Sequence, residues 1–129
     1  MAPARPGRLD AAVNADARGA LERARARLDR LSLYPRPVET RRVRIYTVPP
    51  FFRLPRFRRF DGFTAYSLIL LRDRPGEGTA SDDLITHELC HTWQMQHRPF
   101  AMPLSYLRHG YRNNPYEVEA RRAVSETAG

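Results

Sequence analysis

The sequence contains no lysine, only one cysteine and no long hydrophobic run. All 22 basic residues are arginine, and they outnumber the 14 acidic residues to give a formal net charge of +8. We attribute the missing lysine to a GC-rich coding sequence, so the charge alone says little about function. It still permits weak binding of nucleic acid or of an anionic surface through the arginines.

The other absences concern location. The longest apolar run, residues 68–71, is far shorter than the roughly 20 residues of a membrane-spanning helix. The N-terminal residues contain no apolar stretch of the kind found in secretory signal peptides. Cys90 has no partner for an internal disulfide, which agrees with a reducing compartment. We therefore expect a cytoplasmic protein with no transmembrane segment.

The length of 129 residues and the 42% hydrophobic content are typical of one soluble domain. Apolar residues recur at helical spacing from Leu9 to Leu31 and predict a long amphipathic helix, ended by Pro35 and Pro37. Its apolar face either packs on the core or binds a partner. We expect a helix and linker in residues 1–37 and a catalytic core in residues 42–129.

Two strands are predicted next. Residues 43–47 alternate between apolar and polar and indicate a half-buried strand, whereas residues 66–72 indicate a more buried one. Between them, residues 51–63 interleave phenylalanine with arginine and have no clear period. We interpret this segment as a long loop that aromatic anchors hold to the core. Base stacking and contact with a membrane interface are the alternatives.

Two further helices are expected in the C-terminal half. Gly76-Glu77-Gly78 breaks the chain, and Ser81 with the acidic residues after it suits the start of a helix that runs to about His97. Pro99 and Pro103 interrupt the chain beyond this helix. A final helix begins at Asn114-Pro115 and continues toward Ser125.

The central helix carries the sequence His87-Glu88-Leu89-Cys90-His91. Residues four apart lie roughly 40° apart around a helix, so both histidines can bind one metal ion. Glu88 lies about 100° from His87 and suits a general base for a zinc-bound water, whose pKa zinc lowers toward ~7. The opposite face, with Leu89, is apolar. Two ordinary histidines on a solvent face are the alternative, and Cys90 is interpreted as a small core residue.

A catalytic zinc ion usually has three protein ligands. Glu117 is the third ligand that we favour, because it shares a helix face with Ala120, whose small side chain permits close approach to the central helix. As the third helical residue, Glu117 could instead bond back to Asn114 in a capping box. Glu119 is a weaker ligand candidate, expected to pair with neighbouring arginines.

His97 offers a different ligand set. It lies ten residues after His87, which is the spacing in metzincins, and Met102 follows as in their Met-turn. Metzincins, however, have glycine at the position of Gln94, where their helix turns sharply. With Gln94 present, we expect the helix to continue and to carry His97 away from the other ligands.

The segments 87–94 and 114–120 resemble those of the gluzincin clan of zinc peptidases, in particular the small forms called minigluzincins. The resemblance implies an α+β, zincin-like fold, in which a short sheet packs on the active-site helix and a C-terminal helix carries a glutamate ligand. It implies Zn²⁺ bound by His87, His91 and Glu117, and a peptide or protein substrate. It also implies that residues 66–72 form the sheet edge to which an extended peptide adds. Arg121 stands where the clan has Asp or Asn.

Zinc-dependent peptide hydrolysis with Glu88 as general base is therefore the function that we expect. A zinc-stabilised binding or regulatory module, associated with nucleic acid through its arginines, is the alternative, and so is a domain that acts only with a partner. Tyr111, Tyr116 and His109 are candidates for stabilising the oxyanion.

Overall fold

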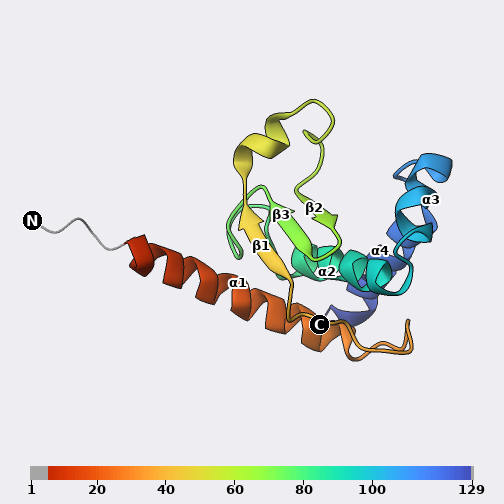
Figure 1. Ribbon diagram of the computed structural model, residues 1–129, viewed down its shortest axis with the longest axis horizontal. Helices are drawn as coiled ribbons and strands as arrows, with labels where there is room; N and C mark the ends of the chain where they lie inside the picture. Colours follow the sequence, from red (N-terminus) through yellow and green to blue (C-terminus); the bar gives the residue numbers. More distant parts are fainter. Residues whose placement is uncertain (1–5, 129) are drawn as a thin grey trace, which may run out of the picture.

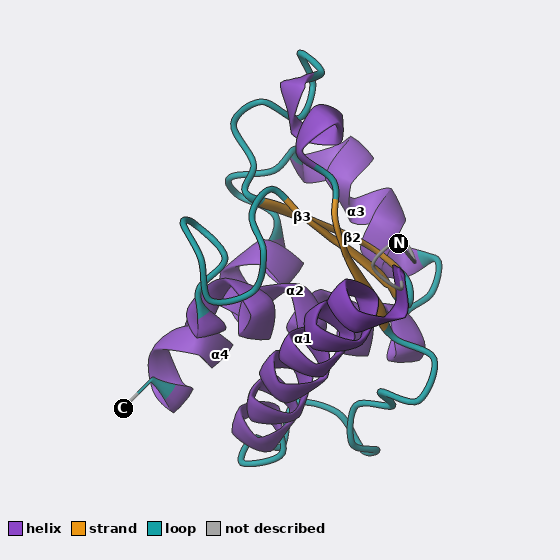
Figure 2. Cartoon of the chain, turned by 90° about the vertical axis from the view of Figure 1, so that its left-hand side faces the viewer, coloured by secondary structure: helices purple, strands orange, loops and turns teal. Residues whose placement is uncertain are grey.

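The computed structural model describes residues 6–128, with side chains from residue 15 onward, and it has an α+β fold (Figure 1). The elements are α1 (Pro6–Leu28), β1 (Arg44–Thr47), the 3-10 helix η1 (Pro49–Arg53), β2 (Gly62–Ala65), β3 (Leu68–Leu71), α2 (Asp82–His97), α3 (Ala101–His109) and α4 (Pro115–Thr127). Helix α2 is central and contacts α1, α3, α4 and the sheet. Figure 2, in which α1 faces the viewer, shows α4 on one side of α2 and the strands above α1.

The three strands are arranged in the order β1-β3-β2, with β1 parallel and β2 antiparallel to β3. The expectation that residues 66–72 form the sheet edge is therefore wrong, because β3 is the central strand. Strand β2, which lies against α2, is the edge strand on that side. It escaped prediction because Gly62–Ala65 is short and has no apolar alternation. The tight turn into β3 includes Tyr66, whose φ of 55° is positive.

Two helix predictions need correction. Helix α1 ends at Leu28, well before Pro35 and Pro37, because the chain turns there and brings Leu31 and Tyr34 back onto the core. Residues 101–109 form α3, although Pro99 and Pro103 were expected to interrupt the chain. Pro103 lies in the first turn of α3, where a proline removes no hydrogen bond that the helix needs.

The apolar face of α1 packs on the core, as the first of its two interpretations expects. The buried core residues from α1, the strands, α2 and α4 are Ala20, Leu21, Ala24, Leu28, Ile69, Leu71, Ile85, Leu89, Cys90, Trp93, Ala120 and Ala123. Ion pairs tie α1 to the start of α2, with Arg23 3.0 Å from Asp82 and Arg27 2.8 Å from Asp83. Among the described residues, no helix combines the length and hydrophobicity needed to cross a membrane.

Helix α2 begins where the sequence predicts. The Ser81 side chain accepts a hydrogen bond from the Leu84 amide, and two aspartates occupy the first turn. From Ile85 to Met95 almost every residue is buried, including Glu88, His91 and Gln94. Burial of such polar groups is costly unless each has a partner. The polar residues on this side of α2 are therefore buried, as in a functional site, and do not form a solvent-exposed face.

The aromatic residues of the segment 51–63 anchor it to the core, as predicted. Phe52 is fully buried, and the Phe51 ring stacks on the Phe57 ring at a centroid distance of 4.3 Å. Phe63 contacts both of these stacked rings. The arginines of the segment, in contrast, are exposed.

Candidate metal centre

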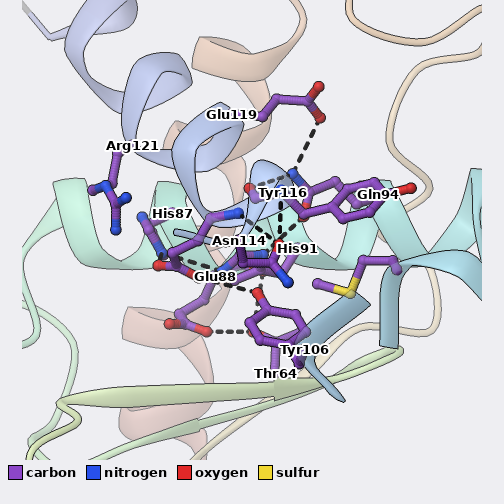
Figure 3. Close-up of polar contacts among 12 residues, drawn as sticks. Thr64, His87, Glu88, His91, Gln94, Tyr106, Asn114, Tyr116, Glu119 and Arg121 are labelled. Carbon is purple, nitrogen blue, oxygen red and sulfur yellow. Dashed lines mark hydrogen bonds and ion pairs between the residues drawn. The ribbon is translucent and has the colours of Figure 1, made fainter. Parts of the chain in front are cut away.

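Helices α2 and α4 bring His87, His91 and Glu117 together. His87 Nε2 lies 2.6 Å from Glu117 Oε1, and His91 Nε2 lies 2.9 Å from Glu117 Oε2. The two Nε2 atoms are 3.1 Å apart (Figure 3). One potential ligand atom from each residue therefore converges within 4.8 Å of the others.

The donor set fits a divalent metal ion. Bonds of 2.0–2.2 Å at tetrahedral angles place ligand atoms about 3.3 Å apart, slightly more than the separations of 2.6 to 3.1 Å observed here. Two imidazoles and one carboxylate also form a known catalytic ligand set that leaves one coordination position open. A small outward movement of the three side chains would admit the ion.

The start of α4 directs Glu117 toward the histidines. The Asn114 side chain caps the helix by accepting hydrogen bonds from the amides of Tyr116 and Glu117, at 2.8 and 3.3 Å. The Glu117 carboxylate does not bond back to Asn114 and faces α2 instead, so the capping-box alternative is not realised. Ala120 is fully buried, which is consistent with the close approach expected of these helices.

The charges in the cluster favour a cation. Burial of Glu117 raises its pKa, but hydrogen bonds with His87 and His91 outweigh burial and hold the pKa well below its usual range. Burial lowers the pKa of His91, yet its hydrogen bond with Glu117 and the charge of Glu88 raise it above its ordinary value overall. The carboxylates that attract a proton to His91 would equally attract a metal ion.

Strand β2 positions Glu88, which is buried at 5% exposure. The Thr64 hydroxyl lies within hydrogen-bonding distance of both the Glu88 carboxylate and the Glu88 carbonyl oxygen. A Cβ atom at Gly62 would lie only 3.0 Å from Glu88 Cγ and 3.2 Å from Oε1. Glu88 therefore occupies space that the missing side chain of Gly62 leaves. The sequence indicates neither Gly62 nor Thr64 as a positioning residue, because β2 has no recognisable strand pattern.

The Gln94 side chain determines which ring nitrogen of His91 carries a hydrogen. Its amide nitrogen donates to the Tyr116 carbonyl at 2.8 Å and to Glu119 Oε1 at 3.1 Å, and both partners are acceptors only. Gln94 Oε1 consequently faces His91 Nδ1 at 2.8 Å, so Nδ1 must carry the hydrogen. The Nε2 lone pair is then available to a metal ion, as outer hydrogen-bond partners of metal-binding histidines commonly ensure.

We expect Gln94→Leu to weaken metal binding by about 10- to 100-fold, the usual cost of losing such a partner. The substitution removes the acceptor of the His91 Nδ1 hydrogen while keeping a side chain of similar length. A competition titration against a chromophoric chelator measures the affinity. Gln96→Leu is the matched control, because Gln96 bonds to Glu39 and lies outside the cluster. Equal affinities for both variants would contradict the role of Gln94.

The other ligand candidates lie apart from the cluster. Glu119 accepts hydrogen bonds from the Tyr34 hydroxyl at 2.6 Å and from Gln94, so the expected pairing with arginine is wrong. Helix α2 continues past Gln94, as predicted, and carries His97 onto the Tyr34 ring at a centroid distance of 4.9 Å. Its Nδ1 lies 3.1 Å from the Trp93 carbonyl oxygen.

Two cavities open beside the cluster. One, of about 560 Å³, is mainly apolar and is lined by His91, Phe63, Met95, Met102 and Pro103, among others. The other, of about 910 Å³, is lined by His87, Arg59, His109, Arg112 and Arg121, among others. Glu88, Glu117 and Tyr111 line both cavities. A ligand could therefore reach the His87, His91 and Glu117 cluster through either cavity.

Tyrosine side chains also surround Glu117. The Tyr106 hydroxyl donates to Glu117 Oε2 at 3.0 Å. The pKa values of Tyr106 and Tyr111 are both raised, mainly by burial and to a lesser extent by the negative charge of Glu117. Both phenols therefore stay protonated and can donate. Tyr116 contributes its backbone carbonyl to Gln94. Arg121 donates to the Arg112 carbonyl at 3.0 Å and lines the same cavity as His87.

Comparisons with family models, with curated proteins and with solved structures find no match to this chain. We therefore infer its function from the geometry of the site itself.

Proposed function

We propose that this protein is a zinc-dependent metallopeptidase in which His87, His91 and Glu117 hold the ion and Glu88 is the general base. The observation that carries the proposal is the convergence of three ligand side chains beside a buried glutamate, at the meeting point of two open cavities. Zinc is the metal proposed because two histidines and a glutamate are a ligand set that catalytic zinc ions use.

When bound, the zinc ion supplies a Lewis acid that polarises the substrate carbonyl and lowers the pKa of water. Glu88 accepts a proton from the attacking water and passes it to the nitrogen of the leaving amine as the carbon–nitrogen bond breaks. Thr64 and Gly62 hold the Glu88 carboxylate for this transfer. Tyr111 lines both cavities, and we propose that its neutral phenol donates to the negative charge that develops on the carbonyl oxygen, whereas the Tyr106 hydroxyl already donates to Glu117.

We extend the proposal to a gluzincin-like arrangement. It is supported by the order of a helix with two histidines and a later helix with the third ligand, and by an antiparallel strand beside the first helix. Among the described strands, β2 pairs only with β3, so its outer edge is open to an added strand. Residues 62–66 line the apolar cavity, and we infer that an extended peptide pairs with β2 there.

The test is cleavage of an unfolded protein and of a mixed peptide library by the zinc-loaded chain, followed by mass spectrometry of new termini. We expect cleavage that a chelator abolishes and added zinc restores. A chain that binds zinc and remains folded but cuts neither substrate would contradict the proposal. That result would favour the alternative of a zinc-stabilised binding module.

A further inference from the structure

The outer face of α3 carries an exposed apolar stripe. Phe100, Leu104 and Leu107 are 77%, 59% and 85% exposed. Their spacing of four and then three residues places them on one side of the helix. Met102, on the opposite side, is buried and lines the apolar cavity. Helix α3 therefore has two apolar sides, of which the described residues cover only one.

The chain around this stripe is basic and has no acidic residue. No Asp or Glu occurs between Glu88 and Glu117, whereas Arg98, Arg108 and Arg112 are all exposed. On a helix, Arg108 follows Leu104 by one turn and lies on the same side. We call Arg98, Phe100, Leu104, Leu107 and Arg108 the α3 surface.

A second segment of the same character shares the lining of the apolar cavity with α3. Residues 40–60 also contain no acidic residue, and they expose Arg53, Arg56 and the 50% exposed Leu54. The two segments meet where the Phe60 and Tyr111 rings lie 4.7 Å apart. In Figure 1 the loop (yellow) and α3 (blue) both project on the side of the molecule away from α1. The arginines of the loop therefore add to the positive charge near the α3 surface.

We propose that the α3 surface docks on an anionic lipid bilayer. Aliphatic side chains that enter the interface, with arginines that meet anionic headgroups, are the combination that holds peripheral proteins on membranes. A second copy of the chain fits less well, because each copy carries a net charge of +8 and would repel the other. Nucleic acid would use the arginines, but the stripe offers only the Phe100 ring for base stacking, and Leu104 and Leu107 would stay exposed.

The docked orientation has a consequence for the metal centre. The inner side of α3 lines the apolar cavity next to His91, so docking would place that cavity close to the bilayer. The docking proposal does not depend on catalysis, because it uses none of the metal ligands.

The test is cosedimentation of the full chain with vesicles of phosphatidylcholine alone or with added phosphatidylglycerol. We expect binding only to the anionic vesicles, weakened by salt. Leu104→Gln/Leu107→Gln should lower the partition coefficient about tenfold or more through lost apolar burial. Arg98→Gln/Arg108→Gln should lower it by a similar factor. The matched controls are Leu33→Gln, an exposed leucine elsewhere, and Arg18→Gln/Arg122→Gln, which removes equal charge outside the α3 surface.

Three results would overturn the proposal. The first is no sedimentation with anionic vesicles at low salt. The second is evidence that net charge alone attracts the chain. Either of two observations would give it: the Arg18→Gln/Arg122→Gln control loses as much binding as Arg98→Gln/Arg108→Gln, or Leu104→Gln/Leu107→Gln binds as well as the wild type. The third is a dimer in analytical ultracentrifugation that Leu104→Gln/Leu107→Gln dissociates, which would assign the surface to a second copy.

Discussion

Replacing Glu88 with Gln is expected to lower the rate of peptide hydrolysis by about 10²- to 10⁴-fold, the usual contribution of a positioned general base. Bound zinc should stay unchanged, because Glu88 is outside the ligand cluster. Glutamine has the shape of glutamate, so it fits the narrow space against Gly62 and keeps a hydrogen-bond partner for Thr64. What it lacks is an oxygen basic enough to accept a proton from water.

The measurement compares initial rates and metal content for the wild type, Glu88→Gln and Glu22→Gln. Glu22 is an exposed glutamate on α1, so its substitution makes the same chemical change away from the site. If Glu88→Gln has wild-type activity and full zinc occupancy, Glu88 is not the general base. Loss of zinc in that variant would instead make Glu88 part of the metal site.

Helical periodicity alone predicts that His87 and His91 share one face of a helix. The small Ala120, on the same helix face as Glu117, and the family resemblance favour Glu117, but its contact with the histidines depends on how α4 packs on α2. The contacts that position Glu88 and His91 also depend on how separate elements pack, and no motif marks them. Gly62 and Thr64 act through a four-residue strand that becomes visible only when it pairs with β3.

For Gln94, the sequence predicts the course of the helix but not the contact that the side chain makes. Its presence correctly predicts that α2 continues and carries His97 away from the cluster. Its contact with His91, however, depends on which way its amide is turned, and that is fixed by the Tyr116 carbonyl and Glu119 on α4. Glu119 in turn meets Tyr34, which reaches it only because α1 ends early and the chain folds back. No local pattern encodes such a chain of contacts.

Replacing Glu117 with Ala is expected to weaken zinc binding by more than about 100-fold, because losing even an outer-shell partner costs about 10- to 100-fold. The change removes the one anionic ligand and leaves two imidazoles, which supply too few bonds for a catalytic zinc ion. It also removes the acceptor of the Tyr106 hydroxyl and empties a buried volume, so the variant could fold poorly.

Glu117→Gln separates these effects, because it keeps the volume and an acceptor for Tyr106 and loses only the charge. We expect a folded protein with strongly reduced zinc content, measured by mass spectrometry of the metal together with circular dichroism. Glu119→Gln and His97→Ala are the controls, and both should retain zinc because neither side chain reaches the cluster. Should Glu117→Ala stay fully loaded while His97→Ala loses its metal, the third ligand would be His97. Helix α2 would then have to bend at Gln94, against the uninterrupted hydrogen bonding of its last turn.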